Sequence, residues 1–278
     1  MKLSYLTVIS LALLAAILFA GCTGTQVQPE KNQTVTPTAN KTDLTVFAAA
    51  SLTGVLNDVV KQYETLHPGV HIITNYDGSQ ALRTQIEQGA MADVFLSANT
   101  KQLYALRDQG LMENSSIGLF AKNKLVVIVP ASNPGNITTL QDLARPGIKL
   151  VIGTKDVPIG DYARQILKKM GNDTAYGPSY NTSVLKNVIS EETVVTGVVA
   201  KVQLGEADAG IVYITDVTPE NRDKFTMIPI PDKYNVIAEY PLGIVKSSGN
   251  KDDAASFITY LTGDQGNATL SKYGFAPV

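Results

Sequence analysis

The sequence predicts an α/β protein of two lobes, each built on a mixed, mainly parallel sheet, with two chain crossovers joining the lobes. Short β-compatible apolar runs alternate with helical patterns of about ten residues. Several runs are apolar throughout, which is typical of strands that are buried on both faces of a sheet. About 235 residues remain after the N-terminal region, enough for two lobes of ordinary size.

The first predicted strand and helix meet at a serine. Residues 44–48 are uncharged and β-compatible, and apolar residues recur at helical spacing from Leu52 to Tyr63. We therefore expect Ser51 to be the N-cap of this helix. A helix start has unpaired N–H groups and the positive end of the helix dipole, so this junction is a candidate anion site. Capping alone would also explain the serine.

The same order of strand, turn, serine and helix occurs a second time. Residues 70–75 are the predicted strand, residues 76–80 the turn, and Gly89 ends the helix. A short strand at 93–97, a helix at 101–109 and an apolar strand at 124–130 follow. Between residues 119 and 124 we expect the chain to leave the first lobe.

The second lobe is predicted to contain helices at 140–144, 162–170 and 194–204 and strands at 149–152, 209–213 and 225–230. The chain then returns at 236–240 and adds a strand at 241–245 and a helix at 254–261. We assign residues 43–121 and 238–278 to lobe 1 and residues 122–237 to lobe 2. Two crossovers behind a cleft would act as a hinge that closes on a ligand.

The N-terminus has the features of a signal peptide. Met1 and Lys2 precede an apolar run at 6–20, which is shorter than the ~20 residues of a membrane span. Small residues before Cys22 resemble a lipobox, so we expect cleavage there, lipid attachment to the Cys22 thiol and anchoring to the outer face of the cell membrane. A plain secretory signal with an incidental cysteine is the alternative. Residues 23–42 read as a flexible tether.

Composition excludes several classes of function. The formal net charge is -2 without a basic block, so we expect no nucleic-acid partner. The single cysteine forms no disulfide framework, and Pro68 and Gly69 separate His67 from His71, so these histidines are not a helical metal pair. Neither a Gly-x-Ser-x-Gly elbow nor a P-loop is present. We expect a monomer without metal or cofactor, and an enzyme is the weaker hypothesis.

Four further residues mark candidate anion-binding groups. Ser79 begins the second helix, and amides around Ile159 are free where Pro158 and Gly160 open another. Val195 lies at a fourth helix start, and Tyr213 ends a buried strand with a phenol near the sheet edge where α/β proteins bind ligands. Each also has a plain structural explanation, as a helix entry, a core residue or a satisfied core tyrosine.

Taken together, these segments resemble the substrate-binding proteins of molybdate ABC transporters. The matching pieces occur in the family's order: VFAAASL, DGSQALRTQIEQGAMADVFLSA, GTKDVPIGDYA, TVVTGVVAKVQLGEADAGIVYITD, EYPLGIV and KYGF. The resemblance covers nearly everything from Asp43 to Phe275. It implies a bilobal periplasmic-binding-protein-like (type II) fold, molybdate or tungstate as ligand, and an ABC permease with its ATPase as partners. It implies binding without turnover.

The resemblance also implies which residues bind the oxyanion. Ser51 and Ser79 correspond to serines that use their hydroxyls, and Tyr213 to a tyrosine that uses its phenol. Ile159 and Val195 correspond to residues that contribute backbone amides. Two positions depart from the family: Ile159 stands where alanine is common, and Thr196 stands where arginine is often found.

Such a site offers hydrogen-bond donors only. Molybdate and tungstate are fully deprotonated near neutral pH, whereas phosphate keeps a proton that would meet no acceptor, at a cost of about 1 to 3 kcal/mol. Sulfate is excluded by its smaller size. The alternatives are a protein of the same fold for another oxyanion, such as sulfate, and an enzyme on this scaffold with a cysteine-attached cofactor. The position of Cys22 in the signal region disfavours that enzyme.

Overall fold

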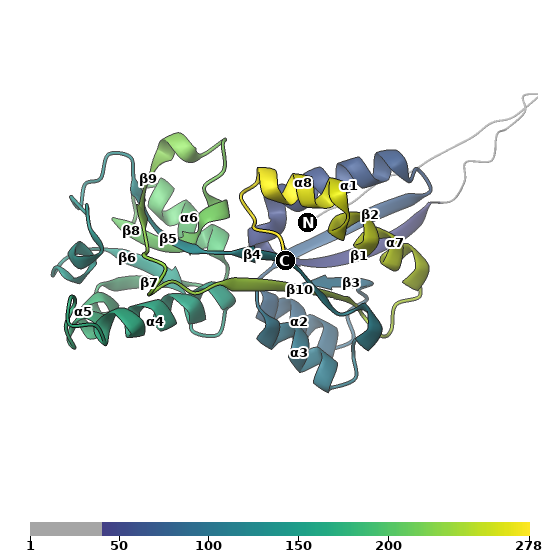
Figure 1. Cartoon of the computed structure of the whole chain (residues 1–278), viewed down its shortest axis with the longest axis horizontal. Coiled ribbons are helices and arrows are strands. Elements are labelled where there is room, and N and C mark those ends of the chain that lie inside the picture. The colour runs from purple at the N-terminus through teal and green to yellow at the C-terminus, as the bar shows by residue number, and fades with distance from the viewer. Residues whose placement is uncertain (1–40) are drawn as a thin grey trace, which may run out of the picture. The chain divides into compact units, whose positions relative to one another are not determined.

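The computed structural model describes residues 41–278 (Figure 1). The predicted signal peptide, most of the predicted tether and the lipid attachment at Cys22 lie outside the described residues. Thr42, the last residue of the expected tether, is the first residue of strand β1. None of the helices within residues 41–278 combines the length and the apolar character that a membrane span needs.

The first sheet has the strand order β2-β1-β3-β10-β4. Its strands are β1 (Thr42–Ala49), β2 (Val70–Asp77), β3 (Val94–Leu96), β4 (Gly118–Asn123) and β10 (Ala238–Ile244). Its helices are α1 (Thr53–Leu66), α2 (Ser79–Glu87), α3 (Thr100–Asp108), α7 (Lys251–Thr262) and α8 (Asp264–Lys272). Helices α1, α7 and α8 cover one face, and α2 and α3 cover the other (Figure 1). We call this body lobe 1.

The second sheet has the strand order β7-β6-β8-β5-β9. Its strands are β5 (Leu125–Pro130), β6 (Leu150–Gly153), β7 (Val188–Glu192), β8 (Ala209–Tyr213) and β9 (Phe225–Pro229). Helix α6 (Val195–Gln203) covers one face, and α4 (Pro158–Gly171) and α5 (Tyr180–Lys186) cover the other (Figure 1). We call this body lobe 2.

Short 3-10 turns connect these elements. They are η1 (Ala50–Leu52), η2 (Asn114–Ser116), η3 (Leu140–Ala144), η4 (Ile214–Asp216) and η5 (Arg222–Lys224). The helix expected at 140–144 is the 3-10 turn η3. Strands β4 and β7 and helices α5 and α8 are elements that the sequence patterns did not reveal; β4 occupies the segment where we expected the chain to leave the first lobe.

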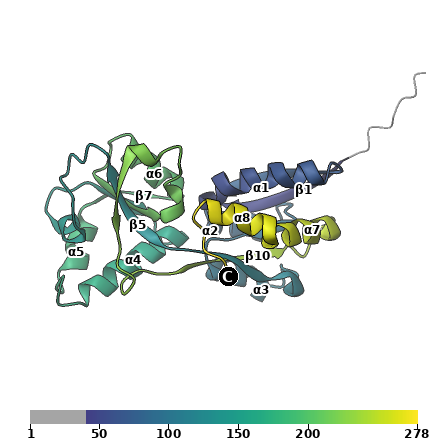
Figure 2. The same ribbon diagram turned by 45° about the horizontal axis from the view of Figure 1, so that its top comes forward.

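The sheets are mixed, as predicted. Among the described strands, four pairings are parallel and four are antiparallel. Strands β5 and β8 are buried along their whole length, which explains why their sequences are apolar throughout. In lobe 1, helices α1 and α8 lie side by side (Figure 2). The predicted fold class is therefore confirmed at the level of two mixed α/β sheets.

The chain changes sheets twice. It passes from β4 to β5 at Lys124 and returns between Pro229 and Ala238. The returning strand begins earlier than expected, because β10 includes residues 238–240, which we expected in the crossover. A register shift lies between Tyr240 and Pro241, where the proline cannot donate to the ladder. The exact lobe boundaries at 121/122 and 237/238 stay a proposal.

Candidate functional site

One cavity is lined by both lobes and contains all five residues that the sequence singled out. Lobe 1 and lobe 2 contribute seven lining residues each, and the empty volume is about 250 Å³. The lining residues are Ala49, Ala50, Ser51, Asp77, Gly78, Ser79, Ala98, Val157, Pro158, Ile159, Thr193, Val194, Val195 and Tyr213. No lysine, arginine or histidine is among these lining residues. The polar surface is therefore made mainly of hydroxyls and backbone groups.

Contrary to our expectation, Ser51 is not the N-cap of helix α1. It is the middle residue of the 3-10 turn η1, and the N-cap of α1 is Leu52. The tighter turn is stabilised by Thr53, whose hydroxyl donates to the carbonyl oxygen of Ala50 over 2.7 Å. Ser51 remains at the cavity wall, half-buried, with its Oγ 3.1 Å from the phenol oxygen of Tyr240. The helix-cap prediction was wrong, while the position at the strand-to-helix junction holds.

Ser79 is the first residue of α2 and is almost fully buried. Its Oγ accepts a hydrogen bond of 3.0 Å from the backbone amide of Ala98. A hydroxyl carries one hydrogen, and the described residues offer no acceptor for it. The Ser79 hydroxyl is therefore free to donate into the cavity.

Ile159 and Val195 bring backbone amides to the opposite wall. Pro158 is the first residue of α4 and has no N–H, so Ile159 supplies the first amide of that helix. Val195 is the first residue of α6. Both side chains are buried, and within residues 41–278 neither amide has a protein acceptor. These two helix starts can therefore stabilise an anion in the cavity.

The bulk of Ile159, which departs from the resembling family, is accommodated by a glycine. A β-carbon on Gly153 would lie 2.7 Å from Cγ2 of Ile159, so the isoleucine occupies the space that a side chain on β6 would need. The second departure, Thr196, is exposed and does not line this cavity. Neither departure closes the site.

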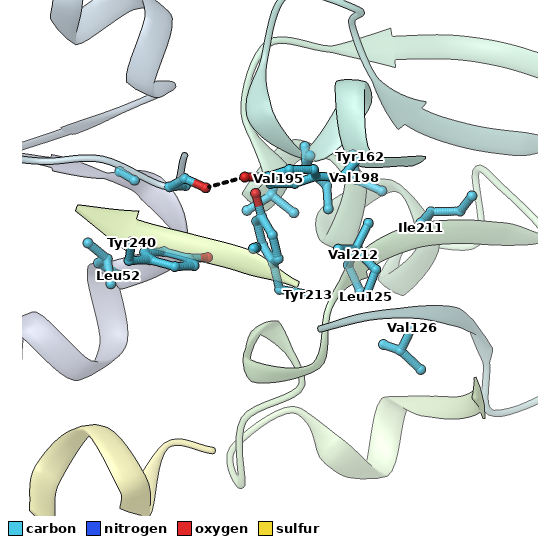
Figure 3. Close-up of a cluster of buried hydrophobic side chains, with 14 of the residues drawn as sticks. Leu52, Leu125, Val126, Tyr162, Val195, Val198, Ile211, Val212, Tyr213 and Tyr240 are labelled. Carbon is cyan, nitrogen blue, oxygen red and sulfur yellow. Dashed lines mark hydrogen bonds between the residues drawn. The ribbon is translucent and has the colours of Figure 1, made fainter. Parts of the chain in front are cut away.

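Tyr213 ends β8 with its phenol buried at the cavity. Its oxygen has no hydrogen-bond partner within the described chain, although the side chain is only 1% exposed. Burial raises the pKa of Tyr213 well above its usual value, so the phenol keeps its proton and is a donor. In Figure 3 this hydroxyl points toward Tyr162 and Val195. A buried donor without a partner is consistent with a ligand position beside it.

Two contacts join the lobes beside the cavity. The Tyr162 phenol of α4 donates to the carbonyl oxygen of Ala98 over 3.4 Å. A β-carbon on Gly78 would lie 2.7 Å from the carbonyl oxygen of Thr193, so only glycine permits this approach of the two backbones. The sequence patterns did not reveal these contacts, because each joins segments that are distant along the chain.

Asp77 is the one charged residue of the cavity wall. It is half-buried, and its Oδ1 accepts a hydrogen bond of 2.7 Å from the Gly78 amide. Sequence reasoning missed it as a site residue, because an acidic side chain is not expected beside an anion. No group of three or more His, Cys, Asp or Glu within residues 41–278 is arranged to hold a metal ion.

Comparisons with known proteins identify a family and several similar proteins. Residues 44–276 match the family model described as bacterial extracellular solute-binding protein. The chain is 33% identical to the molybdate-binding protein ModA of Mycobacterium tuberculosis over 96% of this chain and 97% of that protein. It is 33% identical to the putative ABC transporter substrate-binding lipoprotein YvgL of Bacillus subtilis over 95% of each.

A solved structure is similar along nearly the same length. It is the substrate binding domain of a putative molybdenum ABC transporter from Clostridium difficile, with 30% sequence identity and a TM-score of 0.64. The match covers 86% of this chain and 100% of that chain. The bilobal fold that the sequence resemblance implied is thereby confirmed.

Proposed function

This chain belongs to the bacterial extracellular solute-binding protein family, and we propose that it binds molybdate or tungstate outside the cytoplasm and delivers the oxyanion to an ABC importer. One relative named above is a molybdate-binding protein and the similar structure belongs to a putative molybdenum ABC transporter, and both support this ligand class. Their names are those of binding proteins, and we propose reversible capture without turnover.

The observation that carries the proposal is the set of neutral donors around one cavity. Ser51, Ser79 and Tyr213 present hydroxyls there, and Ile159 and Val195 present amides at helix starts. We assign oxyanion binding to these five residues. Donors without formal charge can hold a dianion because helix-start amides are rigid and already oriented.

The donor set favours an oxyanion that carries no proton. Molybdate and tungstate need only donors, whereas hydrogen phosphate needs one acceptor as well. A buried hydrogen bond that stays unmade costs about 1 to 3 kcal/mol, which is a factor of about 5 to 150 in affinity. Sulfate is also fully deprotonated, so discrimination against it depends on the spacing of the donors.

The route to the importer is part of the proposal. A relative along the full chain is named as a lipoprotein, which supports a lipid anchor on Cys22 that holds the protein at the outer face of the membrane. Closure of the two lobes around the ligand would present a defined surface to the permease, which an ATPase drives from the cytoplasm.

Titration calorimetry of the purified protein tests the ligand. We expect tight binding of molybdate and tungstate and no heat with phosphate. Tight binding of sulfate, with none of molybdate, would instead establish the alternative oxyanion function. A triple variant that replaces Ser51 and Ser79 by alanine and Tyr213 by phenylalanine should lose binding, and unchanged affinity would place the site elsewhere.

A further inference from the structure

We propose that Tyr240 is a positioning residue that orients the Ser51 hydroxyl, so that the Ser51 hydrogen is left to donate to the bound oxyanion. This inference rests on the proposed function of the cavity. Tyr240 does not line the cavity itself. It acts through a relay of hydrogen bonds that runs from Asn123 to Tyr240 and on to Ser51.

The relay begins with a buried amide whose orientation is determined by its neighbours. Oδ1 of Asn123 accepts the backbone N–H of Lys124 over 2.9 Å, so the other amide atom is the NH₂ group. That group donates to Oγ1 of Thr215 over 2.7 Å and faces the phenol oxygen of Tyr240 at 3.5 Å. Asn123 therefore presents a donor to Tyr240.

Tyr240 must then donate in the opposite direction. Its side chain is 0% exposed, and among the described residues Asn123 and Ser51 are the two groups within hydrogen-bond distance of its phenol oxygen. If Ser51 donated to Tyr240, the phenol proton would face the Asn123 donor and remain unpaired in a buried site, which is unfavourable. Burial raises the pKa of Tyr240 far above its usual value, so this proton is present at every working pH.

The Tyr240 ring is held in place by three aromatic neighbours. Its centroid lies 5.4 Å from Phe275, 5.9 Å from Tyr213 and 6.2 Å from Phe120, all in edge-on arrangements. Figure 3 shows the Tyr240 phenol between Leu52 and Tyr213. The ring thus has little freedom to move its oxygen away from Ser51.

The orientation of the Ser51 hydroxyl determines which of its atoms faces the ligand. Ser51 Oγ accepts from Tyr240, so its own hydrogen is left for the cavity, just as the Ala98 amide leaves the Ser79 hydrogen free. Each serine then has its hydrogen free to donate to the oxyanion, and one of the two lone pairs on its oxygen is already used by the protein. Tyr240 contributes to selectivity without contacting the ligand.

The experiment is a double-mutant cycle on the full-length protein with molybdate as probe. In Tyr240→Phe we expect molybdate affinity to fall about threefold to tenfold, because the Ser51 hydroxyl is no longer oriented. In a Ser51→Ala background, Tyr240→Phe should have no further effect. Additive losses in the cycle would overturn the relay, because they would mean that Tyr240 acts independently of Ser51.

A second measurement distinguishes loss of the Ser51 orientation from a general loss of binding-site structure. Binding of hydrogen phosphate, measured by competition, should weaken less than molybdate binding or should strengthen, because the released Ser51 hydroxyl can accept the phosphate proton. Equal weakening for both anions contradicts the proposal. Tyr63→Phe is the matched control: Tyr63 is also 0% exposed, and its phenol donates to Ser256 over 3.0 Å, but it does not line the cavity.

A further variant keeps the test decisive if Tyr240→Phe does not fold. Asn123→Asp retains the acceptor for Lys124 but turns the donor that faces Tyr240 into an acceptor, so the phenol proton is drawn away from Ser51. The ratio of molybdate to hydrogen phosphate affinity should fall, and an unchanged ratio overturns the relay. If the wild type fails to bind molybdate, the proposed function fails first and the inference fails with it; wild-type binding with an additive cycle removes the inference alone.

Discussion

The backbone amide of Ala98 donates a hydrogen bond to the hydroxyl oxygen of Ser79 over 3.0 Å. Both residues are buried, and the bond connects the segment after β3 to the first turn of α2. The Ser79 hydroxyl therefore has two roles. Its oxygen accepts from the Ala98 amide, and its hydrogen is free to donate to the proposed ligand.

Replacing Ser79 by alanine should weaken both binding and folding. Loss of a hydrogen bond to a charged ligand removes about 1.5 to 3 kcal/mol of binding free energy. Leaving the Ala98 amide without an acceptor lowers the free energy of unfolding by about 1 to 3 kcal/mol. Calorimetry with molybdate and urea unfolding measure the two effects. Ser271→Ala, at an exposed position of α8, should change neither; full affinity in Ser79→Ala would remove this residue from the site.

Replacing Gly78 by alanine should prevent close approach of the lobes. The added β-carbon would lie 2.7 Å from the Thr193 carbonyl oxygen across the cavity, a clash that only backbone movement can relieve. Overpacking of this kind costs about 1 to 3 kcal/mol, so molybdate affinity should fall about tenfold or more. Gly69→Ala is the control, because no atom lies within 4 Å of its added β-carbon. Equal affinities of the two variants would mean that the lobes need not meet here.

Replacing Asp77 by asparagine should strengthen binding of a dianion. The variant keeps an oxygen acceptor for the Gly78 amide and removes a negative charge from the cavity wall. Repulsion between a carboxylate and a dianion a few ångströms away in a water-like medium is on the order of 1 kcal/mol, and the gain should shrink as salt is added. Calorimetry at two salt concentrations checks this. Weaker binding would show that Asp77 helps to hold the ligand. Asp223→Asn, at a charged surface position, is the control.

Asp216 should make stability depend on pH. Burial raises the pKa of Asp216 to about 7, and the Tyr213 amide, which donates to its Oδ2 over 2.9 Å, offsets this only in part. Between about pH 4 and 7 the folded chain holds a proton that the unfolded chain has lost. The free energy of unfolding therefore falls as pH rises through this range.

Asp216→Asn isolates this effect from the other titrating groups. The variant cannot ionise and retains an acceptor for the Tyr213 amide, so its stability relative to wild type should increase as pH rises from 4.5 to 7.5. Urea unfolding at several pH values provides the comparison. A constant difference between the two proteins would falsify the assignment of a raised pKa.

Much of the fold could be predicted because its local signals are strong. The apolar runs at β5 and β8 and the glycine and proline breaks around the helices marked most elements. Strand β7 was missed because it lies at a sheet edge, where the alternation of exposed and half-buried residues leaves no apolar run. Ser51 was misplaced because periodicity cannot distinguish a 3-10 turn from the first turn of an α-helix.

The site was predictable only in part for a different reason. All five residues that the sequence singled out lie within two residues of the start or end of a helix or strand, so local patterns and the family resemblance could identify them: Ser51, Ser79, Ile159, Val195 and Tyr213. Tyr240 lies within strand β10, and no local sequence pattern distinguishes it as a site residue. It meets Ser51 from 189 residues away along the chain, and only tertiary packing brings the two oxygens together.

Strand β10 makes lobe 1 depend on the C-terminal part of the chain. All strands of lobe 2 come from one continuous segment, 125–229, which can collapse while residues 238–278 are still absent. Lobe 1 has no such independence, because β10 lies between β3 and β4 and is, among the strands of residues 41–278, the only sheet partner of β4. The sheet that carries Ser51 and Ser79 is therefore complete only once residues 238–244 are present.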